Sequence, residues 1–474
     1  MASQKGNQIA LKGGGYSLAV TAIVLAILIA VNVLAGALPA GVTKLDISQA
    51  KLYSITSNTK VVVNALEEDV TIYWIVQVDQ EDSVLENLLA KYESLSDHIS
   101  VVKRNPDVYP NPTFAKQYTD DTVQNNSLVV VSGEKSRYIA YGDIYLTDVD
   151  YTTYSYVYSF DGEGAITSAI AYVVSDELPK VYTLSGHGEE ALPEYVQTQL
   201  EKENMEWEEF SLLNEDSIPE DAACLMIYAP ATDISEEEAQ LLTEYADNGG
   251  KILVFAGPTQ TGSLENLYSV LENYGVTTQS GVVIEGDRGH YAFGQPYVLM
   301  PDLAEDTLTE PLTSGNYYAI VPIAQGLTVG ETENATVTAL MTTSNTAFSK
   351  AAGYALTTYE KEDGDTDGPF ALAVSIQTQG DGQVIWVASS VFLEEGYNAY
   401  SSGANLNFAM NALTTLAGQS EAVSIRSKSL SYNYLTLSES AASMLKIGLI
   451  GLIPGLFLLY GIFEAVERRK MRNG

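Results

Sequence analysis

A long apolar stretch near the end of the chain constrains its fold more than any other feature of the sequence. Residues 441–466 have Lys446 and Glu464, one near each end, as their only charges. They exceed the roughly 20 residues that a bilayer-spanning helix needs. By the positive-inside rule, the basic cluster that follows marks a cytoplasmic side; it consists of Arg468, Arg469, Lys470 and Arg472. The sequence therefore predicts a transmembrane helix over 441–466 and a basic cytoplasmic tail over 467–474.

A second uncharged stretch lies near the start of the chain, over residues 16–38. A cleavable signal peptide is the competing interpretation, because small residues at 35–40 offer a cleavage site. The apolar core is longer than the roughly 7–15 residues of a signal peptide, which favours an uncleaved anchor. We expect a cytoplasmic N-terminus over 1–15 and a plasma-membrane protein with two spans and both termini cytoplasmic. The region between the spans then lies outside the cytoplasm.

Charge and cysteine content exclude several classes of function. The formal net charge is −37, with 24 Lys and Arg against 61 Asp and Glu, so the surface repels nucleic acid. The single cysteine, Cys224, allows no intrachain disulfide and no cysteine-rich metal site. It lies within an apolar run, which indicates a small buried side chain rather than a catalytic thiol.

The order of elements over residues 41–140 predicts a thioredoxin-like domain. Strand, helix, strand, helix and a final hairpin are expected at 69–77, 83–95, 99–103, 111–118 and 127–140. Redox chemistry in such a fold needs a Cys-x-x-Cys motif, which the sequence lacks. We therefore expect the domain to have a purely structural use.

A second alternation of strands and helices occupies residues 179–426, after a connector at 141–178 that includes the tyrosine-rich segment 151–158. Ser235 and Glu238 form the capping-box pattern at the start of one of its helices. The alternation predicts an α/β domain with a mostly parallel, doubly wound sheet. Residues 427–440 are expected to be a return linker to the last span.

The candidate site residues follow the first strand of this second domain, in the sequence Ser-Gly-His-Gly-Glu-Glu at 185–190. Ligands bind at the carboxyl ends of strands in doubly wound sheets, so His187, Glu189 and Glu190 are ligand-binding candidates, with His187 and Glu189 a potential acid–base pair. The alternative is a tight turn whose surface histidine bonds to the backbone. We favour the turn, because no nucleophile stands in the neighbouring motifs.

Two further loops resemble known sites only partly. The segment 255–262 follows a strand but places Gly257 and Pro258 where a nucleophile would stand. The acidic segment 363–368 resembles the opening of a calcium loop, yet its twelfth position would be Val374 rather than Glu. We expect an acidic hairpin loop there, and the sequence predicts no catalytic residue, metal site or cofactor.

Several segments together resemble the GldG-like auxiliary components of gliding-motility-type ABC transport systems. The matching segments are Leu-Asp-Ile-Ser at 45–48 with Lys-Leu-Tyr-Ser-Ile-Thr at 51–56, Ser-Gly-His-Gly-Glu at 185–189, Asp-Asn-Gly-Gly-Lys-Ile-Leu-Val at 247–254, 405–418, Ile-Arg-Ser-Lys at 425–428, and the last span with its basic tail. One departure is Thr415, which stands where the family usually carries a tryptophan.

The resemblance implies an α/β region similar to a non-catalytic amidotransferase-like domain. It also implies that the chain works in the lipid bilayer beside an ABC-2-type permease, together with a cytoplasmic ATPase. We therefore expect a non-enzymatic accessory subunit whose outer region engages substrate or the cell envelope. Two alternatives stay open. One is a hydrolase-like enzyme using His187 and Glu189, and the other is an envelope-binding scaffold that uses the tyrosine-rich segment 151–158.

Overall fold

The computed structural model describes the greater part of the 474-residue chain. The described residues are 20–30, 52, 54–107, 118–119, 123–150, 155–213, 217–418, 428–430 and 461. The predicted helix at 111–118 lies almost wholly outside these ranges. The predicted segments 1–15, 467–474 and most of the return linker 427–440 also lie outside them, together with the basic cluster from Arg468 to Arg472.

The prediction of two transmembrane helices, and with it the two-span plasma-membrane localisation, is wrong for the part of the chain that the structure describes. No helix there is both long enough and apolar enough to cross a membrane. Of the two predicted spans, only residues 20–30 and Gly461 belong to the described residues.

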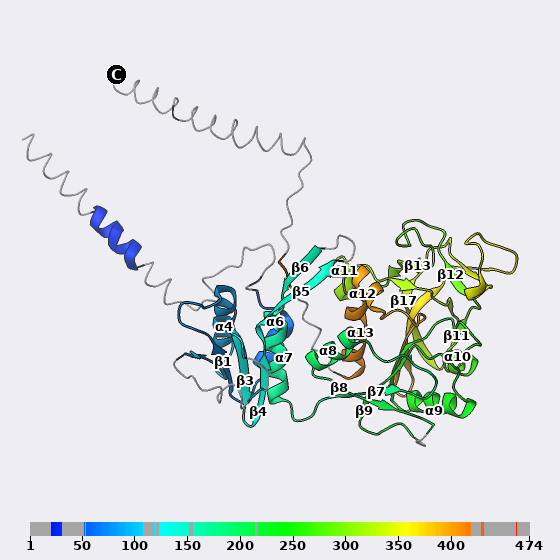
Figure 1. Ribbon diagram of the computed structural model, residues 1–474, viewed down its shortest axis with the longest axis horizontal. Helices are drawn as coiled ribbons and strands as arrows, with labels where there is room; N and C mark the ends of the chain where they lie inside the picture. The colour runs from blue at the N-terminus through cyan, green and yellow to red at the C-terminus, as the bar shows by residue number, and fades with distance from the viewer. Residues whose placement is uncertain are drawn as a thin grey trace, which may run out of the picture. The chain divides into compact units, whose positions relative to one another are not determined.

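A four-stranded sheet forms the first folded part of the chain (Figure 1). Its strand order is β2-β1-β3-β4, with β1 parallel to β2 and antiparallel to β3. The strands are β1 (Val70–Ile75), β2 (Ile99–Arg104), β3 (Ser127–Ser132) and β4 (Lys135–Ile139). Between β1 and β2 runs helix α4 (Ser83–Leu95), whose first turn is capped by the Asp82 carboxylate through 2.9 Å bonds from two backbone N–H groups.

Residues 141–178 contain further regular structure. A short helix α6 (Tyr141–Ile144) leads into the hairpin of β5 (Tyr145–Asp150) and β6 (Ser155–Phe160). Helix α7 (Gly162–Val174) then packs on β3 and β4, next to α3 (Ser57–Asn64). This hairpin receives β22 (Lys428–Ser429), which pairs with β6. Segments far apart in the sequence, α3 and β22, therefore meet beside α7.

The contact between those segments centres on the buried carboxylate of Glu163. Its Oε2 lies 2.8 Å from Lys428 Nζ, and its Oε1 accepts a 2.6 Å bond from the Thr56 backbone N–H and a 2.9 Å bond from the Thr59 hydroxyl. Lys428 Nζ also donates to the Ser54 carbonyl at 2.7 Å. Since Glu163 is the second residue of α7, the helix N-terminus further stabilises its negative charge.

A ten-stranded sheet forms the second folded part. Its main path runs β11-β16-β20-β21-β10-β9-β7-β8, and β17 joins it by pairing with β20 and β14. The strands are β7 (Lys180–Leu184), β8 (Glu206–Phe210), β9 (Ala222–Tyr228), β10 (Lys251–Phe255), β11 (Val276–Thr278), β14 (Asp302–Leu303), β16 (Leu327–Val329), β17 (Ala335–Thr342), β20 (Ala371–Thr378) and β21 (Gln383–Val387).

The chain is thus mixed α/β, but the sheet is parallel over only half of its width. Strands β8, β7, β9, β10 and β21 are mutually parallel, whereas β20, β17, β16 and β11 run antiparallel to their neighbours. The prediction of a mostly parallel sheet missed this because β20 and β21 are joined by a tight hairpin, at Asp381 with φ 63°. A hairpin of this kind can only join antiparallel strands.

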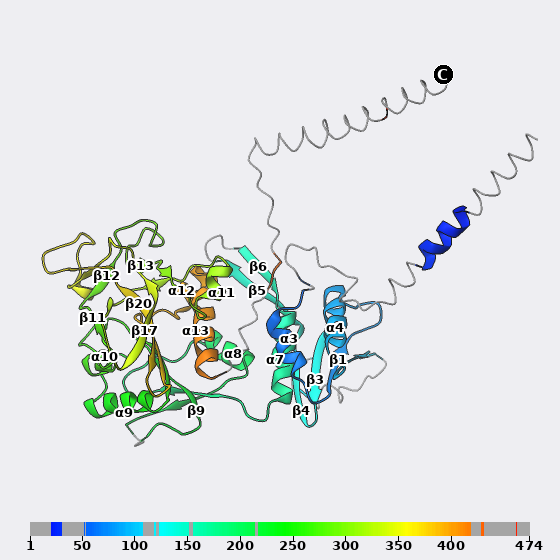
Figure 2. The same cartoon turned by 180° about the vertical axis from the view of Figure 1, so that it is seen from behind.

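Helices cover both faces of the parallel half, as Figures 1 and 2 show. Helices α8 (Glu194–Lys202) and α13 (Ala404–Leu416) lie on one face, and α9 (Glu236–Asp247) and α10 (Glu265–Glu272) lie on the other. Successive strand residues point to opposite faces of the sheet and so enter two separate hydrophobic cores. Leu253 packs toward α13, while Val254 packs toward α9 and α10. Cys224 lies in the α13 core, where burial raises the pKa of its thiol to about 12.

Smaller elements complete this part. They are β12 (Val282–Ile284), β13 (Val298–Leu299), α11 (Glu310–Ser314), β15 (Val321–Pro322), β18 (Phe348–Lys350), the 3-10 turn Gly353–Ala355, β19 (Thr366–Asp367) and α12 (Glu395–Tyr400). The acidic loop before β19 is held by the buried Lys350 ammonium, 2.6 Å from Glu362 Oε2 and 3.2 Å from Asp365 Oδ2. The division into a thioredoxin-like domain over 41–140 and an α/β domain over 179–426, with the connector between them, stays a prediction.

Candidate functional site

The turn after β7 points His187 into the protein. Gly186 and Gly188 on either side have φ of 121° and 72°, in the region that favours glycine. A Cβ on Gly186 would also lie 2.7 Å from the Leu213 side chain. The two glycines therefore permit a sharp reversal at the carboxyl end of the strand, and the imidazole ends up buried, with 5% of the residue exposed.

Two carboxylates flank the imidazole of His187. Nδ1 lies 3.3 Å from Glu189 Oε1, and Nε2 lies 3.2 Å from Glu238 Oε2. The His187 backbone N–H donates to the second oxygen of Glu189 at 2.7 Å. The structure thus brings His187 and Glu189 together, and the histidine is enclosed rather than on the surface as the favoured turn interpretation had it. Glu190 is exposed and takes no part in this cluster.

Glu238 is the residue of this cluster that sequence reasoning missed. It occupies the third position of α9, where the predicted capping box is present: Ser235 N–H donates to Glu238 Oε2 at 2.8 Å and Glu238 N–H donates to Ser235 Oγ at 3.1 Å. The capping pattern is local, whereas the contact with His187 depends on β9 lying beside β7. Glu238 Oε1 is buried without a hydrogen-bond partner among the described residues.

The backbone of the His187 turn also takes part in these contacts. The His187 carbonyl also accepts bonds from Ala231 N–H at 3.1 Å and Thr232 N–H at 2.9 Å. The cluster therefore ties the β7 turn to the segment before α9.

The ends of the neighbouring strands leave no room for a side chain at Gly257, where a nucleophile would stand. A Cβ on Gly257 would lie 2.8 Å from the Ala388 carbonyl oxygen and 3.0 Å from the Ser389 Cα atom. The Gly257 backbone N–H instead donates to Ser390 Oγ at 3.0 Å. Close packing between the ends of β10 and β21 explains why glycine stands there.

An aromatic surface lies above the same strand ends. We use this name for Phe293, Tyr297, Tyr354, Tyr359, Tyr397 and Tyr400. The Phe293 and Tyr400 rings lie 4.4 Å apart, and Phe293 is 53% exposed. The Tyr354 hydroxyl donates to the Pro258 carbonyl at 3.3 Å, which places the surface over the end of β10. These rings come from several loops and from α12, so no local sequence pattern could have found them.

Acidic residues border the aromatic surface. Glu394 and Glu395 are exposed at the start of α12. The pKa of the Tyr397 hydroxyl is raised, first by burial and then by the nearby Glu394 carboxylate. The pKa of Tyr228, at the end of β9, is raised by burial and by Glu190 and Glu394. Among the residues that the structure describes, no group of three or more His, Cys, Asp or Glu side chains is arranged to hold a metal ion.

Comparison with known proteins gives a family match over half of the chain. The model of the family described as "ABC-type uncharacterized transport system" matches residues 178–414. A domain of unknown function, DUF7088, matches residues 49–147. No curated protein matches the sequence.

Solved structures resemble the chain only loosely. The "mmIFT52 N-terminal domain" is 16% identical, with a TM-score of 0.37, over 50% of this chain and 97% of that domain. The exo-β-1,4-mannosidase Op5Man5 from Opitutaceae bacterium strain TAV5 is 10% identical, with a TM-score of 0.24, over 73% and 49% of the two chains. PurLQS from Thermotoga maritima is 10% identical, with a TM-score of 0.26, over 51% and 100%.

Proposed function

Because the chain belongs to the family of auxiliary components described as an ABC-type uncharacterized transport system, we propose that it is a non-enzymatic accessory subunit of an ABC-2-type transporter. Its partners in this proposal are the permease and the cytoplasmic ATPase of that system. The family match is the observation that carries the accessory role. The narrower assignment to the GldG-like, ABC-2 type rests on the motif resemblance.

The aromatic surface is the place where we expect the partner or the transported substrate to bind. It lies at the carboxyl ends of parallel strands, where ligands of α/β sheets bind. Exposed aromatic rings also contribute a large share of the binding energy in protein interfaces. Phe293 and Tyr400 are 53% and 41% exposed, and their rings lie tilted against one another with centroids 4.4 Å apart, so each ring helps to hold the other in position for a contact.

The enclosure of His187 supports the non-enzymatic part of the proposal. Both nitrogens of its ring are occupied by carboxylates of the protein itself, so neither is directed at a substrate. A hydrolase using His187 and Glu189 would need one of these contacts to open. If that second candidate were correct, His187→Gln would abolish activity while the fold persisted.

Affinity purification of the tagged full-length chain from detergent-treated whole cells of its own organism, with partners identified by mass spectrometry, tests the proposal. We expect near-equal amounts of an ABC permease and its ATPase. Recovery of the chain without either would overturn the accessory role.

A pair of double variants tests the location of the contact. Phe293→Ala with Tyr400→Ala should reduce recovery of the partners at least tenfold. Tyr156→Ala with Tyr158→Ala is the matched control, because these tyrosines on β6 are 70% and 54% exposed and lie outside the aromatic surface. The reverse result would favour the scaffold alternative, in which the tyrosine-rich segment makes the contact.

A further inference from the structure

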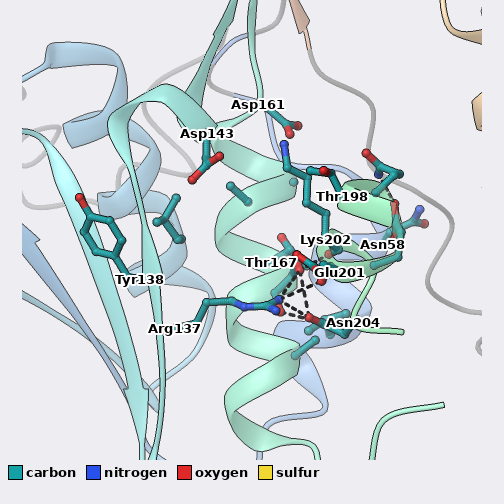
Figure 3. Close-up of a pocket in the computed structure, with 18 residues that line it drawn as sticks. Asn58, Arg137, Tyr138, Asp143, Asp161, Thr167, Thr198, Glu201, Lys202 and Asn204 are labelled. Carbon is teal, nitrogen blue, oxygen red and sulfur yellow. Dashed lines mark hydrogen bonds between the residues drawn. The ribbon is translucent and has the colours of Figure 1, made fainter. Parts of the chain in front are cut away.

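A cavity of about 440 Å³ lies beside α7, between strand β4 and the turn that joins α8 to β8 (Figure 3). Its volume falls in the range of about 300–1,000 Å³ that small-molecule sites occupy. The lining is predominantly polar on the α8 side, and four acidic residues, Asp143, Asp161, Glu201 and Glu203, contribute to it. The cavity is separate from the His187 cluster and from the aromatic surface.

Asp161 stands at the N-cap position of α7 but does not cap the helix. An aspartate at this position ordinarily accepts hydrogen bonds from N–H groups of the first turn. Here the side chain makes no cap hydrogen bond. Its Oδ1 atom is buried and has no hydrogen-bond partner among the described residues, and the residue lines the cavity. A buried carboxylate oxygen without a partner is costly and calls for a specific explanation.

The surroundings of Asp161 favour its neutral form. Its pKa is raised to about 7, mainly by burial; the charge of Lys202 opposes this rise, and the charges of Glu203, Asp143 and Glu163 add to it. Lys202 lines the same cavity and extends toward Asp161 in Figure 3. Even so, the described residues contain no ion pair between the two, so Asp161 keeps an unfilled capacity to accept hydrogen bonds.

The cationic group on the opposite wall is already engaged. The Arg137 guanidinium lies 4.2 Å from the centre of the Tyr172 ring, and it donates to the Glu201 carbonyl at 3.3 Å and to Asn204 Oδ1. It therefore offers little to an anionic ligand. Asp161 Oδ1 lacks a hydrogen-bond partner among the described residues, and the complement of a carboxylate is a cation that donates hydrogen bonds.

We propose that this cavity binds a small organic ammonium compound, whose N–H groups donate to the Asp161 carboxylate. A bare metal ion fits less well, because the described residues contain no cluster of ligands arranged to hold one and the cavity is far larger than an ion. The carboxylates of Asp143 and Glu203 add to the negative potential that an ammonium group would enter. This inference is independent of the proposed accessory role.

Isothermal titration calorimetry of the purified full-length chain with 1,5-diaminopentane tests the inference. The matched probe is 1,5-pentanediol, which has the same length and no charge. Only the ionised carboxylate accepts the ammonium, so apparent affinity should fall about thirtyfold between pH 8.5 and pH 5.5, in proportion to the ionised fraction. At pH 7 about half a proton should be released per ligand bound. The measured binding enthalpy should therefore differ between buffers that have different ionisation enthalpies.

Three variants complete the test. Asp161→Asn keeps the shape and removes the charge, and should weaken diamine binding at least tenfold. Lys202→Met removes the nearest competing cation and should tighten binding. Asp176→Asn, an exposed aspartate outside the cavity, should change nothing. Equal binding of the diol, unchanged binding by folded Asp161→Asn, or no proton release would each overturn the proposal, and so would the absence of any binding heat at millimolar diamine.

Discussion

Lys428 Nζ lies 2.8 Å from Glu163 Oε2, and this ion pair joins the last described strand to the N-terminus of α7. The Glu163 side chain is 2% exposed and that of Lys428 is 15% exposed. The two residues are separated by 265 positions in the sequence, so the pair holds together segments that no local interaction could connect.

Replacing one member of this pair should destabilise the fold strongly. Lys428→Met leaves a buried, uncompensated carboxylate, so we expect the free energy of unfolding to fall by about 3 kcal/mol. Adding Glu163→Gln should recover part of this loss. Urea denaturation followed by circular dichroism measures the effect. The control is Lys103→Met, which removes the exposed pairs with Glu81 and Glu86 and should cost less than about 1 kcal/mol.

Removing the imidazole of His187 should bring two buried carboxylates into direct conflict. In His187→Ala, Glu189 and Glu238 lose the group between them, and we expect a loss of about 2–4 kcal/mol at pH 8. Thermal unfolding measures this loss. The control is the exposed His98, which pairs with Asp69 and should cost less than about 1 kcal/mol when replaced in the same way. An equally small loss for His187→Ala would contradict the expected role of the imidazole between the two carboxylates.

Asp161 should make the protein less stable as pH rises. Its pKa is raised from 3.8 to about 7 in the folded chain, so between about pH 4 and pH 7 the folded state binds the proton more tightly than the unfolded state. The free energy of unfolding then falls with increasing pH across this window and levels off above it. Asp161→Asn should remove this slope and stabilise the protein by up to about 4 kcal/mol at pH 8. An unchanged slope in urea titrations at pH 5 and pH 8 would disprove it.

The packing of Gly257 predicts a cost for any side chain at this position. In Gly257→Ala the new Cβ meets the Ala388 carbonyl, and overpacking of this kind costs about 1–3 kcal/mol. Gly142 in α6 is the matched control, because a Cβ there meets nothing within 4 Å. Urea denaturation of the two variants should show a lower free energy of unfolding for Gly257→Ala and no change for Gly142→Ala. Equal stability of the two variants would show that the strand ends can separate to make room for the Cβ.

Local patterns predicted local structure well. The apolar face expected for 83–95 is the buried face of α4, with Leu85, Leu88 and Tyr92 fully enclosed. The capping box of Ser235 and Glu238 is present at the start of α9. In each case the interactions that decide the conformation lie within a few residues of one another, so the sequence contains the necessary information.

The candidate sites depend on contacts that a single sequence does not reveal. Glu238 reaches His187 because β9 pairs with β7, and Lys428 reaches Glu163 because β22 pairs with β6. The aromatic surface and the cavity at Asp161 likewise draw on separate loops and helices. Apolar stretches near both ends of the chain predicted transmembrane helices from composition alone, and the described residues contain no helix of that kind.

The meeting of Ser54, Glu163 and Lys428 also has a mechanical consequence. A pulling force applied to the chain before Ser54 and after Lys428 would enter and leave the folded region at nearly the same point. The load would fall first on the Lys428 contacts and the two-residue pairing of β22 with β6, while both large sheets stay outside the line of force. Under tension, this junction would yield before either sheet.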